Sequence, residues 1–308
     1  MNSEQLNALP PAELFAELVR GEDLHALLAV ARAEDMGAAG DVTSELCVPA
    51  DLSGQAVVRS RAAGRLAGAA LLQPIAQVYD AALQVEILQQ DGETLEAGTE
   101  IARIAGPLRS ILSAERVMLN FLTHLSGIAS LTARFVHAVA DTKARIYDTR
   151  KTVPGLRHLA KYAVRCGGGF CHRIGLYDAV LIKDNHLTAF AGQPLDAALR
   201  QALAGVSQLS PQPSFVEVEV DTLDQLEQVL RVAGLHIVLL DNMDVLELRQ
   251  AVAMRDQIAP TVQLEASGGV MLGTLHTLAS TGVDRIAVGA LTHSAPALDI
   301  GLDIPSPH

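Results

Sequence analysis

The sequence predicts an α/β protein with a smaller α+β domain at its N-terminal end. Through the second half of the chain, short apolar runs alternate with helical segments of roughly ten to fifteen residues, a pattern typical of parallel strands joined by right-handed crossovers. From residue 55 to residue 106 the chain instead carries short alternating runs that are separated by glycines. With 308 residues, 49% of them hydrophobic, the chain is long enough to bury one large core and one smaller core.

The N-terminal region is expected to contain helices and a small antiparallel sheet. Two short amphipathic helices and a glycine-rich connection are predicted at 11–19, 23–32 and 34–43. Alternation of apolar and polar residues predicts strands at 55–59, 83–88 and 100–104, with a helix at 73–82 among them. A long helix is expected at about 110–140, because apolar residues such as Phe121, Leu125 and Ile128 recur there at helical spacing.

Six alternations of strand and helix are predicted after residue 140. The strands are expected at Ile146 and at 179–182, 215–220, 236–240, 262–266 and 285–288. The helices are expected at 156–166, 194–204, 222–233, 244–257 and 270–281. An open doubly wound sheet and a closed barrel both fit this order, since both are built from parallel strands with helical crossovers.

Polar, charged or glycine residues stand at the carboxyl end of every predicted strand. These positions are Thr149-Arg150-Lys151, Lys183, Glu219, Asp241, Ser267-Gly268-Gly269 and Gly289-Ala290. In barrels and in open sheets alike, ligands bind at the carboxyl ends of the strands, where the strand–helix loops converge. The sequence therefore predicts one shared site at this edge of the sheet, whichever architecture is formed.

Positive charge is concentrated in the stretch from Arg145 to His186. The stretch holds eight Lys or Arg and three Asp, in a chain whose net charge is −12. Cations at strand ends, with the glycine triplet Gly167–Gly169 between them, predict a cavity for a small ligand that carries several negative charges. For any one of these cations, an ordinary solvated surface charge is the alternative.

The later strand ends supply carboxylates and small residues. Glu219 and Asp241 suit Mg²⁺, which prefers oxygen ligands and is often held by one or two carboxylates together with substrate oxygens. Backbone N–H groups of Ser267–Gly269 and Gly289 can cradle a phosphate, and barrels often bind phosphate at their last two strand loops. Two alternatives stay open: Ser-Gly-Gly forms an ordinary turn, and Glu217 or Glu219 faces solvent in the alternating Val-Glu-Val-Glu-Val run.

Composition argues against several classes of partner. The acidic balance and an aromatic content of 3% without Trp disfavour nucleic acid and anionic membranes. No apolar run approaches the ~20 residues of a membrane span, and the N-terminus lacks the basic and apolar regions of a signal peptide. Cys47, Cys166 and Cys171 have no paired spacing, so we expect a reducing cytoplasm. Cys166, Cys171 and His172 fit no common zinc pattern.

The motifs of this chain resemble those of one enzyme family. The motifs are Gly40–Thr43, Ala114–Arg116, Asn120–Leu122, Leu125–Ala129, Asp148–Thr152, Pro154–Leu156, Lys161–Val164, Gly167–Gly169, His172–Arg173, Leu181–His186, Val216–Val220, Leu240–Asn242, Glu265–Gly269 and Val288–Ser294. They follow one another over nearly the whole chain, and in combination they are highly specific. The chain thus resembles the quinolinate phosphoribosyltransferases, the nicotinate-nucleotide pyrophosphorylases (carboxylating) of NAD biosynthesis.

The resemblance implies an architecture and an assembly. It implies an incomplete α/β barrel of six or seven strands at 114–290 and a smaller α+β sandwich-like domain at 1–113, with the segment from about 291 to 308 packing with the smaller domain. It also implies a homodimer in which Arg116 reaches into the site of the partner subunit. The barrel follows from the resemblance alone, because the strand pattern leaves the open sheet equally possible.

The resemblance further implies a pentosyltransferase that uses Mg²⁺. Such an enzyme joins quinolinate to phosphoribosyl pyrophosphate and releases pyrophosphate, CO₂ and nicotinate mononucleotide. The implied quinolinate ligands are Arg116, Arg150, His172, Arg173 and Lys183. The residues implied for the ribose, the pyrophosphate and Mg²⁺ are Lys151, Glu219 and Asp241, and those implied for the 5′-phosphate are Ser267, Gly268, Gly289 and Ala290. Thr149 and Gly269 complete the expected substrate-binding set, in which Lys151, Lys183, Glu219 and Asp241 are the expected catalytic residues.

One residue departs from the family pattern. The family commonly has Asn before the His-Arg pair, where this chain has Cys171 after Phe170, and a thiol cannot replace the donor and acceptor of an amide.

Two alternative functions are considered. The first alternative function is a related phosphoribosyltransferase that acts on another aromatic acid such as nicotinate. The second is a non-catalytic anion-binding barrel, which would bind phosphoribosyl pyrophosphate without releasing CO₂.

Overall fold

The structure, a computed structural model, describes residues 3–305 and divides into two compact units that interleave along the chain. The first, here called the barrel unit, comprises the N-terminal residues through Ala8 together with Arg134–Thr152 and Gly169–Ala290. The second, here called the sheet unit, comprises Leu9–Ala133, Val153–Gly168 and the C-terminal segment from Leu291. The domain ranges predicted from the sequence stay a prediction.

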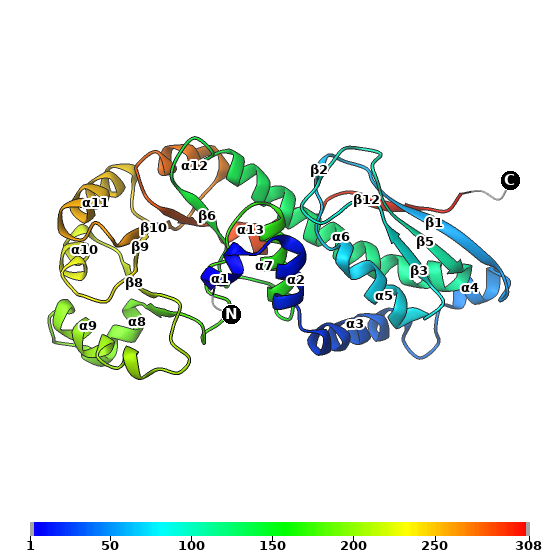
Figure 1. Ribbon diagram of the computed structural model, residues 1–308, viewed down its shortest axis with the longest axis horizontal. Coiled ribbons are helices and arrows are strands. Elements are labelled where there is room, and N and C mark those ends of the chain that lie inside the picture. The colour runs from blue at the N-terminus through cyan, green and yellow to red at the C-terminus, as the bar shows by residue number, and fades with distance from the viewer. Residues whose placement is uncertain (1–2, 306–308) are drawn as a thin grey trace. The chain divides into compact units, whose positions relative to one another are not determined.

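Six parallel strands form the sheet of the barrel unit (Figure 1). They are β6 (Arg145–Tyr147), β7 (Val180–Ile182), β8 (Val216–Val220), β9 (Ile237–Asp241), β10 (Gln263–Ser267) and β11 (Arg285–Ala287). Their order is β6-β11-β10-β9-β8-β7, so each strand from β7 to β11 lies beside the next and the first strand joins the last. A doubly wound sheet would reverse its strand order in the middle, whereas this cyclic order is that of a barrel.

The barrel is open between β6 and β7, which do not pair with each other. Phe170 makes a single parallel bridge to Tyr147 beside β6, with its N–H donating to the carbonyl of Ile146 at 2.8 Å. This one residue stands where a further strand would extend the barrel. The predicted α/β class and the incomplete barrel implied by the family resemblance are both confirmed.

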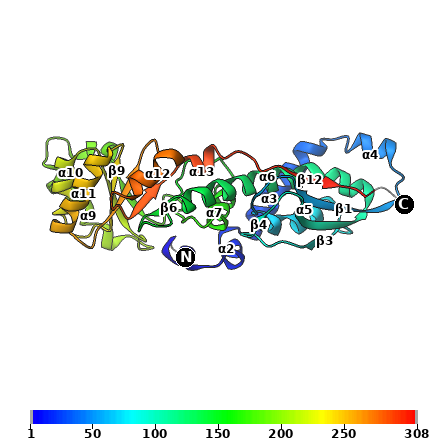
Figure 2. The ribbon, with the colours of Figure 1, turned by 90° about the horizontal axis from the view of Figure 1, so that it is seen from above.

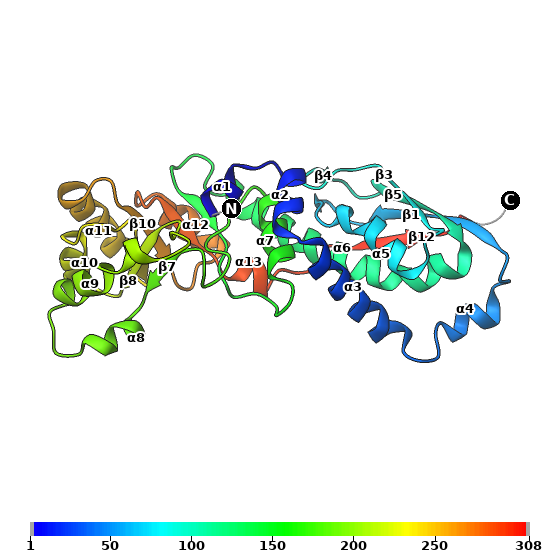
Figure 3. The same ribbon diagram turned by 60° about the horizontal axis from the view of Figure 1, so that its bottom comes forward.

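Helices surround the parallel strands of the barrel unit, as Figures 1 and 3 show. They are α1 (Ser3–Ala8), α8 (Asp184–Leu187), η2 (Thr188–Phe190), α9 (Leu195–Leu203), η3 (Val206–Gln208), α10 (Leu223–Leu230), α11 (Val245–Ile258) and α12 (Leu272–Ala279), and α13 (Ala290–His293) follows β11. Capping explains two of the starts: Thr222 caps α10 by accepting from the N–H of Gln225, and Asp244 caps α11 by accepting from the N–H of Glu247.

Odd-numbered residues of the strands face the inside of the barrel. Phe215, Ile237, Gln263 and Arg285, near the starts of four strands, line one cavity, while Glu219, Leu239, Ser267 and Ala287, nearer the ends, line another. Between these levels lie Glu217 and Glu265, which are fully buried. The even-numbered neighbours are apolar and buried on the other face, below the helices. The alternation therefore places the charged side chains of these strands in the interior, together with apolar ones such as Leu239, and leaves an apolar outer layer.

The sheet unit contains a four-stranded antiparallel sheet in the order β12-β1-β5-β3 (Figure 1), of which Figure 2 labels β1, β3 and β12. Its strands are β1 (Ser53–Ser60), β3 (Gln84–Ile87), β5 (Glu100–Pro107) and β12 (Ile300–Asp303), and a separate small pair is formed by β2 (Gly64–Arg65) and β4 (Thr94–Leu95). The helices are α2 (Pro11–Leu18), α3 (Gly21–Met36), α4 (Val42–Cys47), η1 (Ala69–Leu71), α5 (Leu72–Tyr79) and α7 (Arg157–Cys166), together with most of α6 (Leu108–His137).

The loop predicted at 34–43 is shorter in the structure. The preceding helix α3 continues to Met36, and α4 begins at Val42 because Asp41 caps it by accepting from the N–H of Ser44 at 2.9 Å. The other elements predicted for this region lie within a few residues of where the sequence placed them. Among the described residues, no helix combines the length and the apolar character needed to cross a membrane.

Candidate active site

A cavity of about 450 Å³ lies at the carboxyl ends of the barrel strands, and we call it the carboxyl-end cavity. The predicted site residues that line it are Thr149, Arg150, Lys151, His172, Arg173, Lys183, Glu219, Asp241 and Ser267. They come from β8, β9 and β10, from the segments after β6 and β7, and from the segment between α7 and β7 that follows Phe170. The strand-end pattern in the sequence is therefore brought together in one place.

Two arginines of this cavity, Arg150 and Arg173, lie close enough for their charges to repel each other. Arg150 has a buried Nε with no hydrogen-bond partner among the described residues. Burial, and then the charge of Arg150, lower the pKa of Arg173 from its ordinary value. Asp178 fixes the loop after Arg173 by accepting from the N–H groups of Ile174 and Gly175 at 2.9 and 2.8 Å. Two guanidinium groups are thus held near each other, an arrangement that an anion would stabilise.

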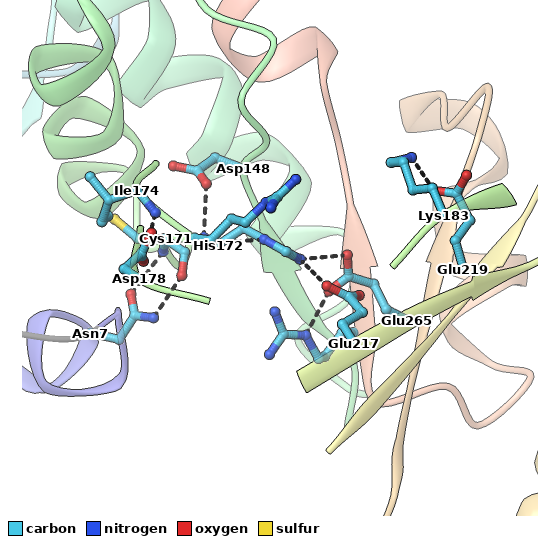
Figure 4. A network of polar contacts seen from close by, with 12 residues as sticks. Asn7, Asp148, Cys171, His172, Ile174, Asp178, Lys183, Glu217, Glu219 and Glu265 are labelled. Carbon is cyan, nitrogen blue, oxygen red and sulfur yellow. Dashed lines mark hydrogen bonds and ion pairs between the residues drawn. The ribbon is translucent and has the colours of Figure 1, made fainter. Parts of the chain in front are cut away.

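The carboxylates of the cavity stand on neighbouring strands. Glu219 is in register with Leu239, and Asp241 lies two residues further along β9 and in register with Ser267. All of these side chains share the inner face. Lys183 forms an ion pair with Glu219, whose side chain is 14% exposed (Figure 4). Two carboxylates that face a cavity fit Mg²⁺, which would complete its oxygen ligands from a bound phosphate-containing substrate and water.

His172 is held by contacts on both ring nitrogens (Figure 4). Its Nδ1 accepts the backbone N–H of Arg173 at 2.8 Å, and its Nε2 lies 3.0 Å from Glu217 Oε2 and 3.2 Å from Glu265 Oε1. Burial opposes the charged imidazole, whereas the charges of Glu265 and Glu217 favour it and raise the pKa of His172. Because Nδ1 accepts a hydrogen bond, the ring proton that faces the two carboxylates is on Nε2. His172 lines the cavity in a fixed orientation.

Cys171, the departure from the family pattern, is held by an asparagine from another part of the chain. The side chain of Asn7 in α1 accepts from the backbone N–H of Cys171 and donates to its carbonyl, both at 2.8 Å (Figure 4). The Cys171 thiol is buried. Because His172 is oriented by Arg173 and by the two glutamates, its orientation does not depend on an amide side chain at position 171.

Three residues of the barrel interior, Glu217, Glu265 and Arg285, were not identified from the sequence. Arg285 donates from Nε to Glu265 Oε2 at 2.6 Å. Burial, and then the charge of Glu265, raise the pKa of Glu217. Against the effect of burial, His172 and Arg285 lower the pKa of Glu265 to about 2. The idea that Glu217 faces solvent is therefore wrong, because both faces of a barrel strand are buried. The signal was present: Glu217 and Glu219 on β8 and Glu265 on β10 all stand at odd positions, and β9 alone separates these two strands.

The remaining predicted residues are placed elsewhere or do not line the cavity. Gly268 and Gly269 follow Ser267 in the loop before α12, and both have positive φ, at +98° and +56°. Gly289 precedes α13, which begins at Ala290. Arg116 lies on α6 in the sheet unit with its side chain 63% exposed. The roles predicted for all of these residues stay predictions.

We expect Gly268→Ala to destabilise the loop after β10. A Cβ at this position would lie 2.0 Å from Oδ1 of Asn242, on a backbone with φ of +98° that L residues rarely adopt. We expect the free energy of unfolding to fall by about 1–3 kcal/mol, which is the usual cost of such backbone strain. Chemical denaturation measures this loss. Gly273→Ala is the matched control, because no atom lies within 4 Å of its added Cβ; equal stability of the two variants would contradict the prediction.

Comparison with known protein families covers both parts of the chain. Residues 41–126 match the family model described as quinolinate phosphoribosyl transferase, N-terminal domain. Residues 128–303 match the model described as the C-terminal domain of the same enzyme. The two matched segments follow each other directly, in the order that the descriptions state.

Individual relatives are similar over most of their length. A nicotinate-nucleotide pyrophosphorylase (carboxylating) from Mycobacterium leprae is 45% identical over 273 residues, which cover 88% of this chain and 93% of the relative. A chloroplastic protein of the same name from Arabidopsis thaliana is 40% identical over 92% of this chain and 83% of its own. Human nicotinic acid phosphoribosyltransferase is only 15% identical, with a TM-score of 0.57, and so shares the fold alone.

The solved structure of nicotinate-nucleotide pyrophosphorylase from Francisella tularensis superposes with a TM-score of 0.82, at 36% identity over 97% of this chain and 99% of that one. The enzyme from Ehrlichia chaffeensis gives the same TM-score at 34% identity over 91% and 98% of the two chains. Fold, matched segments and sequence identity agree. The chain belongs to the quinolinate phosphoribosyl transferase family.

Proposed function

We propose that this chain transfers the phosphoribosyl group of phosphoribosyl pyrophosphate to quinolinate and removes CO₂, giving nicotinate mononucleotide and pyrophosphate. The observation that supports this most strongly is the carboxyl-end cavity, where Arg150, Arg173 and Lys183 stand beside the carboxylates Glu219 and Asp241. Cations and carboxylates in one cavity suit an anionic acceptor next to a donor that arrives with Mg²⁺. Membership of the family selects quinolinate as that acceptor.

Quinolinate is a pyridine with carboxylates on adjacent ring carbons. We assign the two carboxylates to Arg150 and Arg173, because a guanidinium group can bind a carboxylate through two parallel N–H bonds. Lys183 adds a third positive charge. His172 contributes its ring, since both of its nitrogens are already engaged. An acid with a single carboxylate, such as nicotinate, would leave part of this charge without a partner.

The ribosyl donor is assigned to the acidic side of the cavity. Lys151 and a Mg²⁺ ion held by Glu219 and Asp241 would neutralise the pyrophosphate, with Thr149 beside it. The Ser267–Gly269 loop, with Gly289 and Ala290, would hold the 5′-phosphate through backbone N–H groups. When bound, Mg²⁺ supplies charge stabilisation to the departing pyrophosphate. The ion pair between Lys183 and Glu219 would then yield to contacts with the two substrates.

The reaction needs orientation and charge stabilisation more than proton transfer. With the two carboxylates of quinolinate bound by Arg150 and Arg173, the pyridine nitrogen would be held against the ribose C1. As the C1–oxygen bond to pyrophosphate breaks and the C1–nitrogen bond forms, cations of the cavity stabilise the leaving group, and Glu219 and Asp241 stabilise the positive sugar. The resulting pyridinium withdraws electrons from its C2 carboxylate. The electron pair of the C2–carboxylate bond therefore stays on the ring as CO₂ leaves, and a proton from water completes the product.

An assay of CO₂ release from carboxyl-labelled quinolinate tests this function. We expect release only when phosphoribosyl pyrophosphate and Mg²⁺ are both present, and loss of release after chelation of the metal. Nicotinate in place of quinolinate should support little pyrophosphate formation. Binding of the donor without release of CO₂ would favour the non-catalytic barrel, and efficient use of nicotinate would favour the other phosphoribosyltransferase.

Arg116 is proposed to act in the site of a partner subunit. It is exposed on α6, and a homodimer would allow it to contribute a further cation to quinolinate. We expect Arg116→Ala and Lys183→Ala to be inactive alone. Their mixture, after exchange of subunits, should recover about a quarter of the wild-type activity, because half of the dimers then contain one intact site.

The control for this experiment mixes Arg173→Ala with Lys183→Ala, two residues that line the same cavity. Both belong to one subunit, so this mixture should recover nothing. Absence of recovery in both mixtures would show that Arg116 does not act across subunits.

A further inference from the structure

A second cavity, of about 680 Å³, lies at the opposite end of the barrel, and we call it the amino-end cavity. It is lined by residues at or near the starts of the strands, among them Arg145, Gln263 and Arg285, and α1 forms one of its walls. None of its lining residues belongs to the carboxyl-end cavity. The function proposed above uses none of them.

Arg285 carries a buried guanidinium group that is only partly satisfied. Its side chain is 8% exposed, and its Nε donates to Glu265 at 2.6 Å. The guanidinium also stacks on Tyr147, with 3.7 Å between Cζ and the centre of the ring. Its Nη2 is buried and has no hydrogen-bond partner among the described residues. A buried charged donor without a partner is costly, and it marks a position where an acceptor would be bound favourably.

A second guanidinium stands beside the first. Arg145 and Arg285 are register partners on the neighbouring parallel strands β6 and β11, so their Cα atoms are about 5 Å apart and their side chains leave the same face of the sheet. Arg145 is held over the ring of Phe170, with Cζ 5.1 Å from the ring centre. Both guanidinium groups are positively charged, so an anion placed between them would be attracted by both.

The rest of the wall also offers hydrogen-bond donors. Nδ1 of His236 accepts the backbone N–H of Val216 at 3.1 Å, which leaves the proton of the neutral ring on Nε2 as a donor. Gln263 adds a side-chain amide. The acid among the lining residues is Glu4, which is exposed on α1. The wall therefore carries more positive than negative charge, and it favours an oxyanion over a cation.

We infer that the amino-end cavity is a binding site for a small oxyanion group, a phosphate or a carboxylate, held between Arg145 and Arg285. Its ligand enters at the end of the barrel opposite to the substrates. Arg285 contacts Glu265, which in turn contacts His172 in the carboxyl-end cavity. An occupant that contacts Arg285 would thus be linked to His172 through two residues, Arg285 and Glu265.

Tungstate, a tetrahedral dianion similar in size to phosphate, locates the site directly. In crystals of the full chain soaked with tungstate, we expect an anomalous peak within hydrogen-bond distance of Arg285 Nη2 and of the Arg145 guanidinium. Peaks confined to the carboxyl-end cavity would overturn the inference. The position of tungstate does not depend on catalysis. The anion site can therefore be absent while the proposed reaction is confirmed, and it can be present while the proposed reaction is not.

Calorimetric titration with inorganic phosphate and, separately, with acetate tests the site in solution. For the favoured anion we expect a binding event that Arg145→Glu weakens at least tenfold, while Arg231→Glu leaves it unchanged. Arg231 is the matched control because it is an exposed arginine of the same unit that forms an ion pair with Glu227. Gln263→Glu places an acid in the same wall without removing a cation, and it should weaken binding as well.

The two arms of the titration separate the chemical sources of the anion. A response to phosphate alone identifies a phosphate group, and a response to acetate alone identifies a carboxylate. If Arg145→Glu and Gln263→Glu leave the affinity for both anions unchanged, the inference is wrong.

Discussion

Arg173→Ala is expected to lower kcat/KM for quinolinate by roughly 100- to 1,000-fold, the range that follows from losing one charge-assisted pair in a partly desolvated site. Arg173 is half-buried, and its pKa is lowered by burial and by the charge of Arg150. Its removal would leave one quinolinate carboxylate without its bidentate partner. Steady-state kinetics with each substrate varied in turn measures the loss, which should be larger for quinolinate than for the ribosyl donor.

Two further variants make this result specific. Arg173→Lys keeps the positive charge but not the planar pair of donors, so we expect an intermediate activity. Arg231→Ala removes an exposed arginine of the same unit and should leave kinetics unchanged. Near-normal turnover of quinolinate by Arg173→Ala would remove this residue from the proposed pocket.

Glu265→Ala is expected to lower the free energy of unfolding of the barrel unit by about 3–5 kcal/mol, as when one partner of a buried ion pair is removed. Glu265 is fully buried and contacts both Arg285 and His172. Without Glu265, the guanidinium of Arg285 would remain buried but would lose the carboxylate oxygen that now accepts its Nε–H at 2.6 Å. Chemical denaturation followed by circular dichroism should show an earlier transition.

The matched comparison is Glu227→Ala. Glu227 on α10 and Arg231, which follows the last residue of that helix, form an exposed pair at 2.7 Å, and exposed pairs of this kind contribute about 0.5 kcal/mol or less. Glu265→Gln keeps the side-chain volume and separates the loss of charge from the loss of packing. Stability of Glu265→Ala within the range of Glu227→Ala would mean that the interior network contributes little.

Local patterns were sufficient to predict most of the elements. The alternation of apolar runs and helical segments placed β7 to β11 within a residue or two, because each strand is a short β-rich run bounded by turn residues. The same pattern placed Lys183, Glu219 and Asp241 at strand ends, and parallel strands bring such ends to one edge. Periodicity, however, allowed an open sheet as well as a barrel, since closure depends on long-range pairing such as that of β6 with β11.

The interior network could not be predicted for a physical reason. Val-Glu-Val-Glu-Val reads as a strand with one polar, solvated face, but in a barrel that face lines the interior, where Glu217 meets His172. The contact of Asn7 with Cys171 joins residues 164 positions apart and carries no local signal. Sequence periodicity shows that two faces of an element differ, whereas the environment of each face depends on the rest of the fold.

The most direct measurement is a crystal structure of this chain with quinolinate, pyrophosphate and Mg²⁺ bound. We expect quinolinate carboxylates on Arg150 and Arg173, with the metal and the pyrophosphate beside Glu219 and Asp241. Quinolinate bound elsewhere, with these two arginines turned toward bulk solvent, would contradict it.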